Sequence, residues 1–200
     1  MEELKELKQR MEEERPTPWN ELPDLALYMD QIISYMPRQL IRFDDRDSLT
    51  SAMVNNYIKD GVVPRAEGKR YNAEHLAYLT MTCVLKQVLP VKDVALLTGR
   101  EMENPDVQAN YDRFCAELSA ALNSAADQLP DELDEDRMAD TAMHCALMSY
   151  AFALSCRRMT EVLRQKQEAQ NPSKKELKAR RKAEKHAEKY AEKHPEEKQA

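Results

Sequence analysis

The stretch TSAMVNNYIKDGVVPRAEGKRYNAEHLAYL, residues 50–79, decides the fold because a helical pattern stops abruptly in its middle. At about 100° per residue, residues 50–60 form a helix with one apolar side, made of Met53, Val54, Tyr57 and Ile58. The opposite side carries Ala52, Asn55, Asn56 and Lys59. Gly61 then ends the helix, and the chain turns.

The two outward asparagines indicate a binding face. Asn has a poor helix propensity and competes for backbone hydrogen bonds, so two neighbouring asparagines destabilise a helix without improving its packing. The Asn amide can pair with N6 and N7 of adenine, Ala can contact a thymine methyl, and a lysine such as Lys59 can bind phosphate. The alternative is that Asn55 and Asn56 only hydrogen-bond to neighbouring loops.

A basic turn follows the helix. Val62–Val63 and Arg70–Tyr71 are the residues with strand character, and they predict a two-stranded ribbon over residues 62–71. A helix that presents amides, followed by a basic ribbon, is typical of a winged helix-turn-helix DNA reader. The residues expected to contact DNA on this pattern are Ala52, Asn55, Asn56, Lys59, Arg65, Lys69 and Arg70.

The composition predicts an all-α protein. Only three of the 200 residues are glycine, and the common residues are strong helix formers. We expect a charged N-terminal helix or arm in residues 1–18 and a helix-turn-helix domain in residues 19–99. An antiparallel helical hairpin in residues 104–168 and a charged, solvated tail in residues 171–200 follow. The charged amino terminus and the lack of a long apolar run predict a cytoplasmic protein without a membrane segment.

The charge distribution limits the ways in which this chain can bind nucleic acid. The net charge is −6, but residues 171–200 contain ten Lys or Arg against six Glu. The other 170 residues therefore have a net charge of −10, which disfavours extensive non-specific binding. A small local basic surface remains compatible with this balance.

Motifs for catalysis or metal binding are missing from the sequence. It has no phosphate-binding loop, no Cys-x-x-Cys pair and no His-Glu metal motif, so we expect no enzyme activity, no cofactor and no metal. No small-molecule effector can be identified. The cysteines, which lie in apolar helical stretches, are expected to be buried, unbridged thiols: Cys83, Cys115, Cys145 and Cys156.

The same stretch resembles known families. The segments YIKDGVVP (57–64), KRYNAEHL (69–76) and LPVKDV (89–94) are similar to the DNA-binding head of the MerR family of bacterial transcription regulators. With ELPDLALYMDQII (21–33), residues 19–98 more closely resemble an uncharacterised bacterial family, the domain of unknown function numbered 1836. The MerR resemblance implies that Arg70 and Tyr71 are wing residues that contact DNA. Where that pattern usually has arginine, this chain has Asn55.

Two functions are therefore compared. The first is a sequence-specific regulator that binds double-stranded DNA, with a possible homodimer through the helical hairpin, because one helix and one wing cover few base pairs. The alternative is that the hairpin folds back onto the helix-turn-helix domain and gives a monomer. The second is a protein–protein interaction module on a helix-turn-helix-like scaffold, which the acidic body favours.

Overall fold

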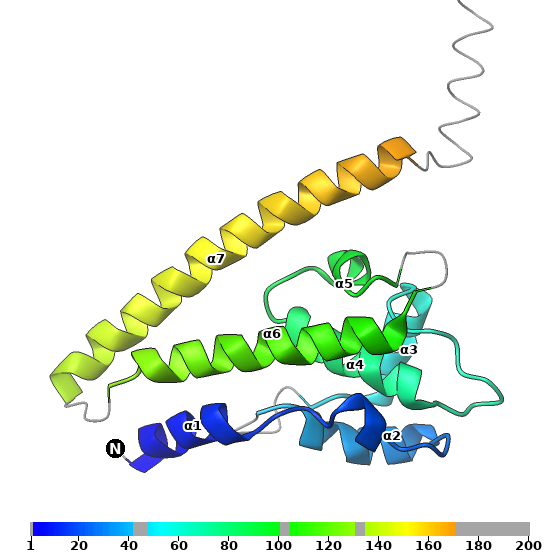
Figure 1. The fold of residues 1–200 in the computed structure, drawn as a ribbon, viewed down its shortest axis with the longest axis horizontal. Helices are drawn as coiled ribbons and strands as arrows, with labels where there is room; N and C mark the ends of the chain where they lie inside the picture. Colours follow the sequence, from blue (N-terminus) through cyan, green and yellow to red (C-terminus); the bar gives the residue numbers. More distant parts are fainter. Residues whose placement is uncertain (1, 42–47, 101–104, 131–134, 171–200) are drawn as a thin grey trace, which may run out of the picture. The chain divides into compact units, whose positions relative to one another are not determined.

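The computed structural model describes residues 2–41, 48–100, 105–130 and 135–170 (Figure 1). As expected, the fold is all-α. Its helices are α1 (Glu2–Glu13), η1 (Trp19–Glu21), α2 (Met29–Tyr35), η2 (Met36–Gln39), α3 (Ser51–Lys59), α4 (Ala73–Leu85), α5 (Val91–Leu97), α6 (Val107–Gln128) and α7 (Glu135–Gln170). The chain divides into two units, residues 1–157 and 158–200; the described part of the second is the end of α7.

Helix α3 has the boundaries and the buried side that its sequence predicts. The Thr50 hydroxyl oxygen accepts a hydrogen bond from the Met53 N–H at 3.2 Å, which caps the first turn. Val54 and Tyr57 are buried in the core. The helix ends before Gly61, whose φ of 76° lies in the left-handed region that favours glycine.

The predicted ribbon differs from the observed backbone. Among the described residues, two isolated antiparallel bridges replace it, Leu27 with Tyr71 and Glu67 with Arg70. Val62 and Val63 are buried, and both donate their N–H groups to the Tyr57 carbonyl, at 2.9 and 3.2 Å. These donors are therefore engaged in closing α3, and Tyr71 pairs with a segment more than forty residues away in the sequence.

Helix α4 forms the centre of the core. Its cap is Asn72, whose side-chain oxygen accepts a hydrogen bond from the His75 N–H at 3.3 Å. Nearly the whole helix is buried, including Leu76, Tyr78 and Leu79. Helices η2, α5 and α6 pack around it.

Helix α6 packs on the head, residues 19–99, with an apolar seam in which Val107, Tyr111 and Phe114 follow at gaps of four and three. Figure 1 shows α6 lying along α1 and α4. Within that seam, Tyr111 is buried in the main core, and Val107, Phe114 and Cys115 pack against the same cluster. The antiparallel pairing of α6 with α7 stays a prediction.

Polar groups fasten α6 to the N-terminal segment. The Tyr111 hydroxyl donates to the Thr17 carbonyl at 2.9 Å. The Gln39 side chain accepts from the Thr17 N–H at 3.1 Å and donates to the Thr17 hydroxyl at 2.8 Å. This network joins α6, η2 and the segment before η1 at one buried point.

The four cysteines are not bridged by disulfides, but they are not all buried as the sequence predicted. Cys83 is buried, Cys115 and Cys156 are half-buried, and Cys145 is exposed. The correction for Cys145 follows from α7, much of whose apolar surface is exposed. The tail predicted for residues 171–200 lies outside the described residues. Among the helices that the structure describes, none combines the length and apolar character needed to cross a membrane.

The buried tyrosines predict a loss of stability in alkali. Burial, assisted by the nearby Cys83, raises the pKa of Tyr57 to about 12, and burial also raises the pKa of Tyr111. An unfolded tyrosine titrates near 10, so between about pH 10 and 12 the unfolded state binds fewer protons and the free energy of unfolding falls. Urea unfolding at pH 8 and 11 measures this, and Tyr57→Phe should make the fall smaller. An equal fall in Tyr57→Phe would exclude Tyr57 as a cause.

Candidate nucleic-acid interface

The outward side of α3 presents the four residues that the helical pattern placed there. Ala52, Asn55, Asn56 and Lys59 are all exposed, whereas Val54 and the other apolar residues of α3 are buried or half-buried. Helix α3 also contacts α2, so its buried side is held by the core. The two amides and one ammonium group lie on a surface that a groove or a partner can reach.

A tight turn follows at residues 67–70. Glu67 and Arg70 exchange backbone hydrogen bonds of 2.9 and 3.2 Å, and both central residues have positive φ, 56° at Gly68 and 64° at Lys69. Positive φ at both positions is the pattern of a type I′ hairpin turn. Among the residues that the structure describes, Lys69 is the one non-glycine residue with positive φ. Its side chain is exposed at the tip of the turn. Arg65, just before the turn, is also exposed.

Arg70 is positioned by Tyr28, a residue that the sequence analysis missed. The Arg70 guanidinium donates to the Tyr28 hydroxyl at 3.0 Å and lies over the Tyr28 ring, 5.1 Å from its centroid. Tyr28 itself is 47% exposed. No local signal could reveal this contact, because the two residues are 42 positions apart and meet through the Leu27–Tyr71 bridge.

Tyr71 lies in the core, which corrects its expected place at the surface. Its side chain is 5% exposed and its ring meets His75 edge-on at 5.3 Å between centroids. The same burial raises the pKa of Tyr71. Its backbone hydrogen bonds with Leu27 fix the path of the chain next to Arg70, so Tyr71 positions Arg70 through the backbone.

The local charge around α3 and the turn is positive. Residues 51–71 contain four cations and two acids: Lys59, Arg65, Lys69 and Arg70 against Asp60 and Glu67. This contrasts with the acidic balance of the rest of residues 1–170. Tyr28, which is distant from these residues in the sequence, adds an aromatic ring and a hydroxyl to this surface.

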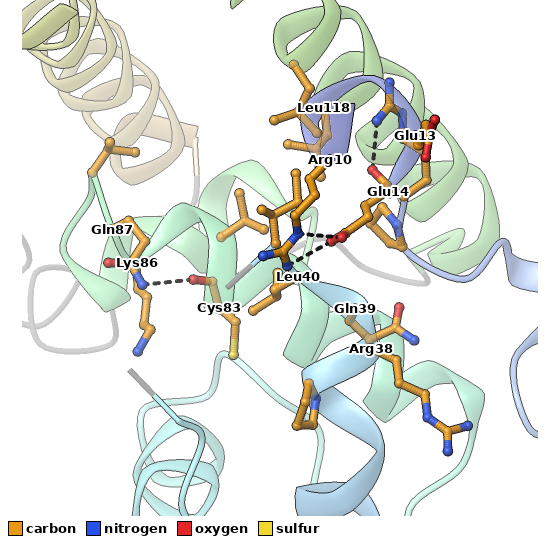
Figure 2. Close-up of a pocket in the computed structure, with 17 residues that line it drawn as sticks. Arg10, Glu13, Glu14, Arg38, Gln39, Leu40, Cys83, Lys86, Gln87 and Leu118 are labelled. Carbon is orange, nitrogen blue, oxygen red and sulfur yellow. Dashed lines mark hydrogen bonds and ion pairs between the residues drawn. The ribbon is translucent and has the colours of Figure 1, made fainter. Parts of the chain in front are cut away.

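A second feature is an open groove of about 1300 Å³ between α1, η2, α6 and the end of α4 (Figure 2). Arg10 forms an ion pair with Glu14 at 2.5 Å, and this bond raises the pKa of Arg10. The Gln87 amide donates to the Cys83 carbonyl at 3.4 Å. The groove thus combines an apolar wall with charged side chains of both signs. Within the described residues, no three His, Cys, Asp or Glu side chains gather as metal ligands.

Comparison with known proteins adds a family to this geometry. Residues 17–114 match the family described as Domain of unknown function (DUF1836). The match confirms the resemblance to that family and extends it into α6, where it includes Tyr111. The DUF1836 region contains α3, the 67–70 turn and Tyr28. No curated protein and no solved structure matches the chain.

Proposed function

We propose that this chain is a sequence-specific regulator of transcription that binds double-stranded DNA and is MerR-like in its mode of reading. The observation that carries the proposal is the outward side of α3, where Asn55 and Asn56 are exposed beside Ala52 and Lys59. Helix α3 would enter the major groove with this side. Each asparagine that pairs with adenine would then contribute about 1–3 kcal/mol of discrimination.

The turn after α3 supplies the phosphate contacts in this proposal. Lys69 stands at an exposed tip, and Arg65 and Arg70 are exposed near it. The contact with Tyr28 restrains the Arg70 guanidinium before DNA arrives, which lowers the entropic cost of ordering it on a phosphate. Phosphate contacts of this kind set the register of the helix without reading the sequence.

The acidic body supports selective rather than general binding. Residues 1–170 have a net charge of −10, so this part of the chain would repel DNA except near the local positive surface. Such a protein would bind a few phosphates and depend on base contacts for affinity. It would act in the cytoplasm of a bacterial cell, where the DNA lies.

We expect Asn55→Ala and Asn56→Ala each to cost about 1–3 kcal/mol in binding to the preferred site. The site is first selected from random double-stranded DNA with the full chain, and affinity is then measured by fluorescence anisotropy. The loss should shrink on random DNA, because base contacts are absent there. Equal losses on both DNAs would contradict base reading by α3.

The matched controls are Lys59→Ala and Arg70→Ala. Each should weaken selected and random DNA similarly, and each should lower the salt slope of log K by roughly one unit, because a phosphate contact is lost. Tyr28→Phe keeps the ring beneath Arg70 and removes the hydroxyl. It should weaken both DNAs by less than Arg70→Ala does. A larger loss in Tyr28→Phe would contradict the assigned role of Arg70.

A second candidate is a protein–protein interaction module that uses the same outward side of α3. The observation that favours it is the acidity of the body, with Asp60 at the end of α3 and Glu67 in the turn. Retention on DNA that falls steeply as salt rises supports DNA binding. Capture of a protein partner that is indifferent to salt, without retention on DNA, supports the module.

A further inference from the structure

Helix α7 exposes an unusual amount of apolar surface. Between Thr141 and Cys156 the sequence has no Asp, Glu, Lys or Arg. The large apolar side chains exposed up to residue 154 are Met138, Met143, Leu147, Met148, Tyr150, Phe152 and Leu154. A solvated helix normally carries charged residues over most of its surface, so this segment requires a partner.

One stripe of this surface is regular. Met143, Leu147, Tyr150 and Leu154 follow at gaps of 4, 3 and 4, which places them on one side of the helix. Each is between 56% and 66% exposed. On the other side, Phe152 lies between Met148, four positions earlier, and Met159, seven positions later, and both methionines are exposed. The first side is distinguished by the even spacing of its four large side chains, which the other side lacks.

Neither α6 nor α1 has a large apolar side chain at an exposed position that could cover this stripe. Every exposed position of α6 is alanine or a polar residue, because its large apolar side chains face α1 and α4. The exposed residues of α1 are charged or Gln. By sequence, residues 171–200 contain two large apolar residues, Leu177 and Tyr190. The lack of large apolar side chains at the exposed positions of α1 and α6 favours a partner in another molecule.

The stripe is suited to a second copy of itself. Its gaps read the same in both directions, so two antiparallel stripes place Met143 beside Leu154 of the second copy and Leu147 beside Tyr150 of the second copy. The charges agree with this orientation. Residues 135–140 contain three acids and one base, Glu135, Asp136 and Asp140 with Arg137, whereas residues 157–164 contain three bases and one acid, Arg157, Arg158 and Arg164 with Glu161. Antiparallel pairing brings the acidic end of one helix to the basic end of the other.

We propose that α7 is a self-association surface, on which the stripe Met143–Leu147–Tyr150–Leu154 packs against the same stripe of a second copy in antiparallel orientation. The pairing is isologous, so it closes at two chains. It covers apolar groups that α6 and α1 leave exposed. This inference does not depend on DNA binding, and its test uses no DNA.

The test is the mass of the full chain by sedimentation equilibrium over micromolar to submillimolar concentration. We expect twice the chain mass of 23.2 kDa, and a return to 23.2 kDa in the double variant Leu147→Glu/Tyr150→Glu. Both substitutions lie at exposed positions, so the circular dichroism spectrum should keep its helical signal. A wild-type mass of 23.2 kDa throughout, or a double variant that still dimerises, overturns the proposal.

The matched control is Phe152→Glu, which places the same charge at an equally exposed position on the other side of α7. It should leave the dimer intact; loss of the dimer would overturn the assignment to this stripe. Orientation is tested by cysteine cross-linking in a background of Cys145→Ser and Cys156→Ser. A mixture of Met143→Cys and Leu154→Cys chains should form a disulfide-linked heterodimer, whereas linked homodimers of either variant would indicate parallel pairing.

Discussion

Replacement of Tyr111 by alanine is expected to lower the free energy of unfolding by about 5 kcal/mol, the upper end of the range for buried aromatic residues. Tyr111 is fully buried, and its ring lies 6.2 Å from Trp19 and 6.3 Å from Phe114. Its hydroxyl donates to the Thr17 carbonyl at 2.9 Å. The substitution leaves a cavity and an unpaired acceptor at the point where three segments meet. Because a domain is stable by only about 5–15 kcal/mol, the variant should be largely unfolded at 37 °C.

Urea unfolding followed by circular dichroism measures this loss, and Tyr111→Phe is the matched control. Phe keeps the ring and removes only the hydroxyl, so it should cost about 1–3 kcal/mol, as loss of a buried hydrogen bond does. If Tyr111→Ala lowers the free energy of unfolding by less than Tyr111→Phe does, the packing of α6 does not depend on this ring. Equal costs would assign the whole effect to the hydroxyl.

The second large effect is expected at Tyr57, whose substitution by alanine should cost about 3–5 kcal/mol. Tyr57 is 5% exposed, lies within the main core cluster, and its carbonyl accepts the N–H groups of Val62 and Val63. Truncation of the ring removes the anchor that holds α3 against the core. Thermal and urea unfolding of the full chain measure the effect.

Asn56→Ala is the control for Tyr57, because the two residues are neighbours on opposite sides of α3. It should leave stability unchanged or raise it slightly, since alanine is the better helix former. DNA affinity should fall in Asn56→Ala, although the stability of this variant is unchanged. If Asn56→Ala unfolds the protein while DNA binding by the remaining folded fraction is unaffected, the asparagine is structural and the proposed regulator loses its main support.

These two sides of α3 were predictable because helical periodicity is local. Residues 50–61 contain the capping threonine, the buried stripe and the terminating glycine within a few turns. The cap at Asn72 is local in the same sense. Short-range rules therefore located the helix, its end and its exposed side.

The parts that sequence reasoning missed depend on distant contacts. The Leu27–Tyr71 bridge moved Tyr71 into the core and brought Tyr28 to Arg70. A strand pattern of two residues does not specify its partner, so the ribbon predicted for Val62 and Val63 is replaced by hydrogen bonds from their N–H groups to the Tyr57 carbonyl. Likewise, the apolar seam of α6 has the same period whether it faces α7 or the head.

The boundaries of the family match separate two pieces of the structure that pack on each other. The match covers residues 17–114, so α1 precedes it and the second half of α6 follows it. These two outlying pieces meet: Arg15 bonds to Asn123, and the Lys8 ammonium lies 3.5 Å from the Leu129 carbonyl. Helices α1 and α6 therefore pack on each other, and the two pieces form one structural unit whose halves lie on either side of the matched region in the sequence.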